Sequence, residues 1–258
     1  MKKLLIIACL LSLTAIAADK PKKQLTPEEK AARRELMMQR TGGPFTIPAQ
    51  GFVAMVDLQK RANYEKTSAK FIETFSGFGV AAKPMKTEGT FTVKDLTTKR
   101  TELGAGSVVF IIDDPAYPMT LLSMETRSAV VNVAALATDN PSPALLTRRT
   151  CKMIGRISML ASGGAETASP TCDLQPVTNL KELDMNEGKG AEAYVMMGVI
   201  NGLNKAGVTP PRRTSYLQAC KLGVATPPTN QYQKVIWDKV HATPKNPLKI
   251  EFDPKKGR

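Results

Sequence analysis

The stretch Ser107-Val108-Val109-Phe110-Ile111-Ile112 carries the strongest strand signal in this chain of 258 residues. It is a continuous apolar run, and Asp113-Asp114-Pro115 closes it with turn residues. Such a run is typical of a strand that is buried on both faces of a sheet. We therefore expect the fold to be organised around it.

Strand and helix patterns alternate on both sides of this run. Strands are predicted at 51–57, 80–85, 119–124 and 129–136, and helices at 63–75, 92–103 and 144–160. The alternation predicts an α/β fold with a mixed sheet and packed helices. At about 200 residues, this part of the chain is long enough to form one domain with a full core.

Composition divides the chain into four parts. Residues 1–18 read as a signal peptide, 19–48 as a basic arm, 49–175 as the α/β core, and 176–258 as a helical subregion that packs on the core and ends in a basic tail. The arm is predicted to hold a short helix that begins at Thr26 and Pro27. Further helices are predicted at 191–205, 215–222 and 229–241, and an edge strand at 248–252.

The N-terminus predicts export. Met1-Lys2-Lys3 precedes an apolar run over 4–16, and the small residues Ala17 and Ala18 offer a cleavage site. The run is too short for a membrane span, and no other stretch approaches the about 20 apolar residues that a span needs. We expect a secreted or periplasmic protein without a membrane span.

The chain is strongly basic, with a formal net charge of +13. Without residues 1–18 the balance is 34 basic against 23 acidic residues, or +11. This charge favours an anionic glycan, mucin or other extracellular polyanion as partner. Aromatic residues do not follow the basic runs, so specific nucleic-acid recognition is not expected. The candidate anion-binding residues are Arg33, Arg34, Arg148, Arg149, Arg212 and Arg213.

Histidine and cysteine are scarce. His241 is the one histidine, which excludes a zinc site built from two or three histidines. It lies at the predicted end of a helix, where a capping role is expected. Cys151, Cys172 and Cys220 follow the signal peptide; we predict a disulfide between Cys172 and Cys220 and a buried free thiol at Cys151.

A longer pattern emerges from residue 107 onward. A buried strand that ends in Asp113-Asp114 is followed by an edge strand, the 129–136 strand and a long helix that begins Leu145-Leu146-Thr147-Arg148-Arg149. Together with the strand, helix and strand of residues 51–85, this layout resembles the core of the archaemetzincin-like metallopeptidases. The resemblance covers residues of about 50–175 and implies a zincin-like fold.

In that family the long helix carries the zinc motif H-E-x-x-H-x-x-G, whose glutamate acts as base. The stretch that corresponds here is Gly155-Arg156-Ile157-Ser158-Met159-Leu160-Ala161-Ser162. Gly155 and Met159 stand at the histidine positions and Arg156 at the glutamate position. Cys172-Asp173-Leu174 resembles the later Cys-x-Met turn, with Leu174 for the methionine. The resemblance thus implies a scaffold without its zinc centre, and we expect no metal and no cofactor.

Two functions are compatible with these features. The first is an exported, non-catalytic protein on a degenerate metallopeptidase-like scaffold, which binds an anionic extracellular partner. The alternative is a divergent secreted peptidase, a hydrolase of extracellular protein such as mucin, that depends on Asp113 and Asp114 and not on zinc. Adjacent residues of a strand point to opposite faces, which favours a turn role for the two aspartates.

Overall fold

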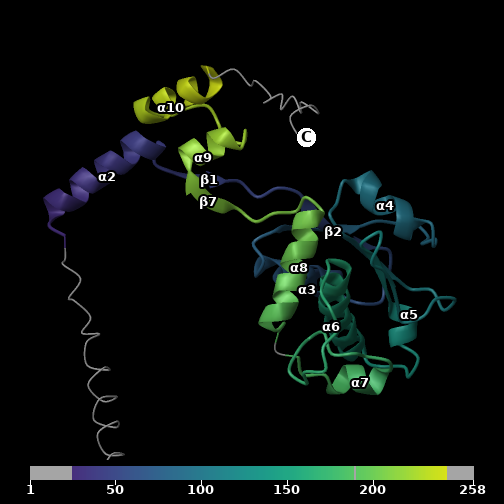
Figure 1. The fold of residues 1–258 in the computed structure, drawn as a ribbon. Coiled ribbons are helices and arrows are strands. Elements are labelled where there is room, and N and C mark those ends of the chain that lie inside the picture. The colour runs from purple at the N-terminus through teal and green to yellow at the C-terminus, as the bar shows by residue number, and fades with distance from the viewer. Residues whose placement is uncertain (1–24, 189, 243–258) are drawn as a thin grey trace, which may run out of the picture. The chain divides into compact units, whose positions relative to one another are not determined.

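The computed structural model describes residues 25–188 and 190–242. The chain forms two compact units. The helical unit comprises Met1–Phe45 and Thr214–Arg258, and the sheet unit comprises Thr46–Arg213. The chain passes between them through two short strands that pair with each other, β1 (Pro44–Ile47) and β7 (Arg212–Ser215) (Figure 1).

The sheet unit is built on a five-stranded mixed sheet with the order β3-β2-β4-β6-β5. Its strands are β2 (Phe52–Asp57), β3 (Ala81–Lys86), β4 (Val108–Ile112), β5 (Thr120–Ser123) and β6 (Ser128–Asn132). The first four strands in this order are parallel, and β5 adds an antiparallel edge. The predicted α/β class with a mixed sheet is confirmed.

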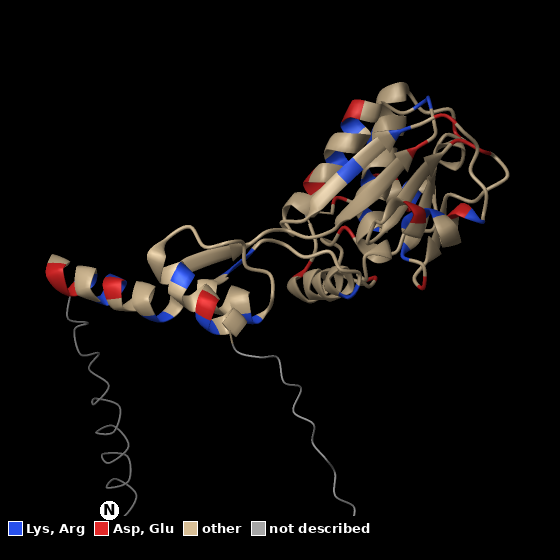
Figure 2. Cartoon of the chain, turned by 90° about the horizontal axis from the view of Figure 1, so that it is seen from above, with Lys and Arg blue, Asp and Glu red and all other residues tan. Residues whose placement is uncertain are grey.

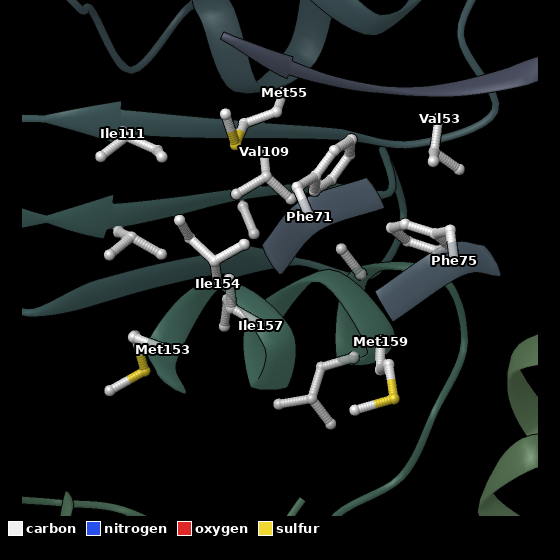
Figure 3. Close-up of a cluster of buried hydrophobic side chains, with 14 of the residues drawn as sticks. Val53, Met55, Phe71, Phe75, Val109, Ile111, Met153, Ile154, Ile157 and Met159 are labelled. Atoms are coloured by element: carbon white, nitrogen blue, oxygen red, sulfur yellow. The ribbon is translucent and has the colours of Figure 1, made fainter. Parts of the chain in front are cut away.

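Strand β4 lies in the middle of the sheet and is buried on both faces, as its apolar run predicts. Val109 and Ile111 face one hydrophobic core, whereas Val108, Phe110 and Ile112 face the other. No residue of β4 is more than 2% exposed. The first core lies between the sheet and the helices α3 and α6 (Figure 3).

Six helices belong to the sheet unit. They are α3 (Tyr64–Ser76), α4 (Asp95–Leu103), α5 (Val133–Leu136), α6 (Pro143–Ala161), α7 (Leu180–Met185) and α8 (Ala193–Lys205). Helix α6 begins with Ser142 as N-cap and Pro143 in the first turn, which suits a residue without a backbone N–H. Of its 19 residues 13 are buried, so α6 is an interior helix of this unit.

The strand predicted over 129–136 is wrong in its second half. Strand β6 ends at Asn132, and the chain then turns into α5. The Asn132 side chain causes this change, because its Oδ1 accepts a hydrogen bond from Ala134 N at 3.1 Å and its Nδ2 donates to the carbonyl oxygens of Asp114 and Tyr117. Asparagine favours such side-chain to backbone bonds over continued pairing in a sheet.

The structure also divides the C-terminal region differently from the prediction. Residues 176–258 were expected to form one subregion on the core, but they split near Arg213. Leu183 of α7 and Val199 of α8 are buried in the core of the sheet unit. Tyr216 and Ile236 are buried in a separate cluster with Cys220. Helices α7 and α8 therefore belong to the sheet unit and α9 and α10 to the helical unit, because their apolar side chains are buried in different cores. The short helix α7, which was not expected from the sequence, lies between α6 and α8.

The described part of the helical unit contains α2 (Pro27–Thr41), α9 (Tyr216–Lys221) and α10 (Gln231–Ala242). The predicted helix start at Thr26 and Pro27 is observed, and Thr26 and Glu29 also form a capping box there. Gly42 ends α2 with a φ of +71°, and a Cβ there would lie 2.9 Å from Tyr216 Cβ and 3.0 Å from Ile236 Cδ1. Glycine is therefore required where this turn meets the small core of the unit.

The predicted signal peptide, 1–18, and the predicted edge strand, 248–252, lie outside the described residues. Within the part of the chain that the structure covers, no helix combines the length and the apolar character that crossing a bilayer requires.

A Gly202→Ala substitution is expected to destabilise the sheet unit by about 2 kcal/mol or more, because the new methyl group would overlap the Ser162 carbonyl oxygen. Gly77→Ala is the matched control, since its Cβ would meet nothing within 4 Å. The control is expected to leave the free energy of unfolding unchanged or to raise it by up to about 1 kcal/mol. Urea unfolding of the two variants measures the difference, and equal effects would contradict the proposed close contact.

Candidate functional site

Helix α6 forms one wall of an open pocket of about 500 Å³ in the sheet unit. Arg148, Lys152 and Gly155 line it from successive turns of one helix face. The facing wall comes from Asp173 and from the segment that follows α7, including Glu187. This pocket is the place where the predicted degenerate motif meets solvent.

The three motif positions have different surroundings. Gly155 lies at the pocket wall, where a Cβ would be 3.3 Å from Lys70 Cε of α3, so a larger side chain would press against that helix. Met159, one turn later, is 4% exposed and belongs to the hydrophobic core (Figure 3). The two positions therefore do not face a common opening.

Arg156 has a structural role. Its side chain is 6% exposed. Its Nε donates to the carbonyl oxygen of Gln175 at 3.0 Å, and its Nη2 pairs with Glu166. Both partners lie in the loop-rich segment after α6, so the guanidinium fastens this segment to the helix. A positive group in this position also disfavours the approach of a metal cation.

The pocket carries charges of both signs. Lys70, Arg148, Lys152 and Arg156 line it together with Asp173, Asp184 and Glu187. The Lys152 ammonium already donates to the carbonyl oxygens of Leu183 and Asp184, at 2.9 and 3.1 Å. Burial and, to a smaller extent, repulsion from Arg148 lower the pKa of Lys152. The pocket is thus a mixed and partly self-neutralised site, without a strong field of one sign.

The thiol in this pocket is not activated. Cys151 is half-buried, where a fully buried residue had been predicted, and burial raises the pKa of its thiol above the ordinary value. The neighbouring Lys70 and Lys66 oppose this shift but do not reverse it. A nucleophilic cysteine needs a lowered pKa, so the surroundings of Cys151 do not favour covalent catalysis.

The predicted disulfide between Cys172 and Cys220 is not present. Both residues are buried free thiols. Cys172 lies in the core of the sheet unit, and Cys220 lies in the cluster of the helical unit. Each sulfur is enclosed by apolar neighbours of its own unit, which is the ordinary environment of a structural cysteine.

The prediction that Arg149 binds an external anion is wrong, because it is already bound within the fold. Its side chain is 3% exposed and holds two carboxylates. Its Nη1 and Nη2 donate to Asp139 at 2.6 and 2.8 Å, and its Nε and Nη2 donate to Asp184 at 3.0 and 2.6 Å. Nη1 also donates to the Leu136 carbonyl oxygen. Such bidentate, charge-assisted bonds are among the strongest that a side chain makes.

The remaining predicted arginines are exposed. Arg33 and Arg34 lie on α2 in the helical unit, and Arg148 lies on α6. Arg212 and Arg213 lie in β7. Arg33 and Arg34 thus belong to the helical unit, and Arg148, Arg212 and Arg213 to the sheet unit.

The two candidate catalytic aspartates have different partners. Asp113 Oδ1 is 3.2 Å from Arg61 Nη1, so this carboxylate is engaged in an ion pair. Asp114 Oδ1 accepts a hydrogen bond from Ala116 N at 2.9 Å, which shapes the turn after β4. A proton-sharing pair requires two carboxylates directed at each other. The observed arrangement instead agrees with the turn role.

His241 lies in the last turn of α10. Its Nδ1 is 2.8 Å from the Trp237 carbonyl oxygen, and its ring stacks on the Trp237 ring with centroids 4.0 Å apart. This position agrees with the predicted role at a helix end. Among the residues that the structure describes, no group of three or more His, Cys, Asp and Glu side chains is arranged to hold a metal ion.

The net charge is unevenly shared between the units. Among the residues that the structure describes, the helical unit contains 7 Lys and Arg against 4 Asp and Glu in 50 residues, whereas the sheet unit contains 18 against 16 in 167 residues. Most of the basic excess therefore belongs to the smaller unit, and Figure 2 shows the charged positions of the described residues. Sequence reasoning did not bring α2 together with α9 and α10 in one unit.

Two polar clusters were also missed. One is the Arg149 site, whose acidic partners lie 10 and 35 residues away in sequence. The other is Asp57 at the end of β2, whose carboxylate accepts hydrogen bonds from Gln59 N and Nε2, both at 3.1 Å. Burial raises the pKa of Asp57, against the effect of these bonds. A buried-strand pattern that ends in a carboxylate was the only local signal for it.

The fold is similar to two solved structures. One is an archaemetzincin from Methanopyrus kandleri, with 16% identity and a TM-score of 0.47, over 60% of this chain and 96% of the other. The second is a zinc-dependent peptidase from Methanocorpusculum labreanum strain Z, with 12% identity and a TM-score of 0.42, over 58% and 100%. No family model and no curated protein matches the chain. The first structure is of the family that the sequence resembles, and the likeness concerns the fold alone.

Asp184→Asn is expected to lower the free energy of unfolding at pH 7 by about 1–3 kcal/mol, since it weakens charge-assisted bonds to buried Arg149. Those bonds hold the pKa of Asp184 below its ordinary value, so their contribution is complete above about pH 4 and is lost as the pH falls through the lowered pKa. The difference between the variant and the unmodified protein should therefore shrink below about pH 4.

Glu187→Gln is the control for this prediction, because Glu187 lines the same pocket but is exposed. Urea unfolding between pH 3 and 7, in about unit steps, measures both variants. A destabilisation by Asp184→Asn that is constant over this range would show that Arg149 does not act through the charge of Asp184.

Proposed function

We propose that this chain is an exported, non-catalytic protein that binds an anionic extracellular partner through its helical unit. In this proposal the sheet unit is a metallopeptidase-like scaffold that no longer carries a reaction. The partner is a polyanion, such as a sulfated or sialylated glycan or a mucin.

The uneven distribution of charge carries the proposal. The described residues of the helical unit carry 7 Lys and Arg against 4 Asp and Glu, and the flanking stretches 19–24 and 243–258 of the sequence add 8 against 3. The described residues of the sheet unit carry 18 against 16 over a far longer segment. Charges of one sign that are concentrated on a small unit create a local field that attracts counter-charged partners. Arg33 and Arg34 are exposed on α2, where they can contribute to such binding.

The chemistry of α6 supports the non-catalytic part of the proposal. Arg156 is used to hold the segment after the helix, and Met159 fills the core. The thiol of Cys151 has a raised pKa, and the Asp113 carboxylate is paired with Arg61. Each of these groups has a structural partner or environment that opposes a catalytic role. The carboxylate-dependent peptidase therefore gains no support from the geometry.

The double variant Arg33→Gln/Arg34→Gln is expected to elute from immobilised heparin at a lower salt concentration than the unmodified protein. The slope of log K against log salt should fall by about one to two, since up to two ionic contacts are lost. Lys60→Gln/Lys181→Gln is the matched control, because it removes two exposed charges from the sheet unit. The proposal is wrong if the control weakens retention as much, or if the unmodified protein is not retained.

Incubation of the purified chain with casein or mucin is expected to release no fragments, with or without added zinc. Gel electrophoresis and mass spectrometry of the digest provide the measurement. Cleavage that a chelator abolishes would refute the non-catalytic proposal in favour of a metal site. Cleavage that survives chelation but is lost in Asp113→Asn or Asp114→Asn would instead establish the carboxylate-dependent alternative.

A further inference from the structure

The helical unit contains a groove of about 1060 Å³ that the sheet unit does not line. Its volume is at the upper end of the range for small-molecule sites, which is about 300–1,000 Å³. All three helices of the unit border it. The apolar part of its surface comes from α9, from α10 and from the residue that follows α9: Leu217, Leu222, Val235, Ile236 and Val240.

Much of this apolar surface is accessible. Leu222 is 47% exposed and Val235 is 62% exposed, so both side chains lie open to solvent where they border the groove. Exposed apolar side chains that gather at one hollow mark a binding surface, in contrast to single ones scattered over a protein. The groove therefore offers a hydrophobic contact that the chain itself does not cover within its described residues.

The charged residues of the groove have one sign. Arg40, Lys221 and Lys239 line it, together with His241, and none of the described residues in its lining is acidic. A ligand that fits must combine an apolar portion with a negative group. The acids elsewhere in the described part of this unit, Glu35 and Asp238 among them, do not belong to the lining.

We propose that the groove binds an anionic phospholipid at a membrane surface, with an acyl chain against Leu222 and Val235 and the phosphate beside Arg40 and Lys221. This inference rests on the proposed function, since it names the chemistry of the anionic partner.

A lipid surface satisfies both parts of the unit at once. A soluble sulfated glycan pairs with the cations but leaves Leu222 and Val235 in water. A lipid supplies the apolar chain as well, and burial of apolar area contributes about 25 cal/mol per Å². The described residues of the unit also include basic side chains outside the groove, Arg33 and Arg34 among them, which a negatively charged leaflet attracts. These arguments favour a lipid surface over an acidic peptide, because a peptide bound in the groove would contact only the basic residues that line it.

The chain contains its own probe for this test. Trp237 is the one tryptophan of the sequence, and it lies in α10 of the helical unit. It is half-buried in the apolar cluster and stacks on His241, which lines the groove. Its fluorescence therefore reports on this unit alone. Bromine atoms placed on an acyl chain quench tryptophan emission only at close range.

The experiment titrates the full chain with phosphatidylcholine vesicles that contain about 30 mol% phosphatidylglycerol, brominated on the acyl chains or not, and with phosphatidylcholine alone. We expect quenching by the brominated anionic vesicles only. Val235→Asn should weaken vesicle binding by about threefold or more, because it removes apolar contact, and should leave heparin retention unchanged, because it alters no charge. Val93→Asn, at a position 58% exposed in the sheet unit, should change neither.

The outcomes separate this inference from the proposed function. Heparin retention together with an absence of quenching overturns the lipid proposal and leaves the proposed function standing. Vesicle binding that Val235→Asn does not weaken also overturns it, because the contact is then purely electrostatic. Quenching by an acidic amphipathic peptide carrying bromine, without quenching by vesicles, replaces the lipid with a peptide partner. Failure to bind heparin and anionic vesicles alike overturns both.

Discussion

The burial of β4 on both faces is the constraint on which the sheet unit depends. A strand with apolar side chains on both sides needs a cover on each side, and α3 with α6 supplies the cover of one face. Helix α6 can fill this position only by burying most of its own surface. Near the pocket it exposes little more than Arg148 and part of Lys152, while Gly155 beside them is buried. This explains why the helix that the family resemblance singles out is occupied with packing and not with presenting ligands.

Local patterns predicted most of the sheet unit, because its signals lie within single elements. The apolar runs of β2 and β4 each identify a strand without knowledge of its neighbours. The Asn132 turn was missed, since it depends on the carbonyl oxygens of Asp114 and Tyr117, which the fold brings close. The local sequence pattern determines that β6 forms. The residue at which β6 ends depends on the tertiary hydrogen bonds that the Asn132 side chain makes.

The adjacent residues Arg148 and Arg149 show that local sequence does not determine which basic residues are free to bind a ligand. Arg148 and Arg149 are alike as sequence, and charge alone predicts that both bind anions. Helix phase separates them, because Arg149 lies on the face of α6 that carries Leu146 and Met153, while Arg148 points to the pocket. The phase was readable from the sequence, but the carboxylates of Asp139 and Asp184 that neutralise Arg149 were not. A basic residue therefore counts toward binding only after its internal partners are known.

The two units differ in how completely they bury their apolar residues. The sheet unit encloses two cores, whereas the main cluster of the helical unit has three buried members, Tyr216, Cys220 and Ile236. Within its 50 described residues the helical unit nevertheless exposes four large apolar side chains, Leu36, Met37, Leu222 and Val235, whereas the 167 described residues of the sheet unit expose seven. A unit with a small core gains most from covering such residues, so leaving them exposed is costly to its own stability. Positive charge on the same unit adds repulsion, which a negatively charged partner relieves. Both features weaken the isolated unit, and contact with an anionic, partly apolar surface would counter both, which is the physical basis of the proposed binding.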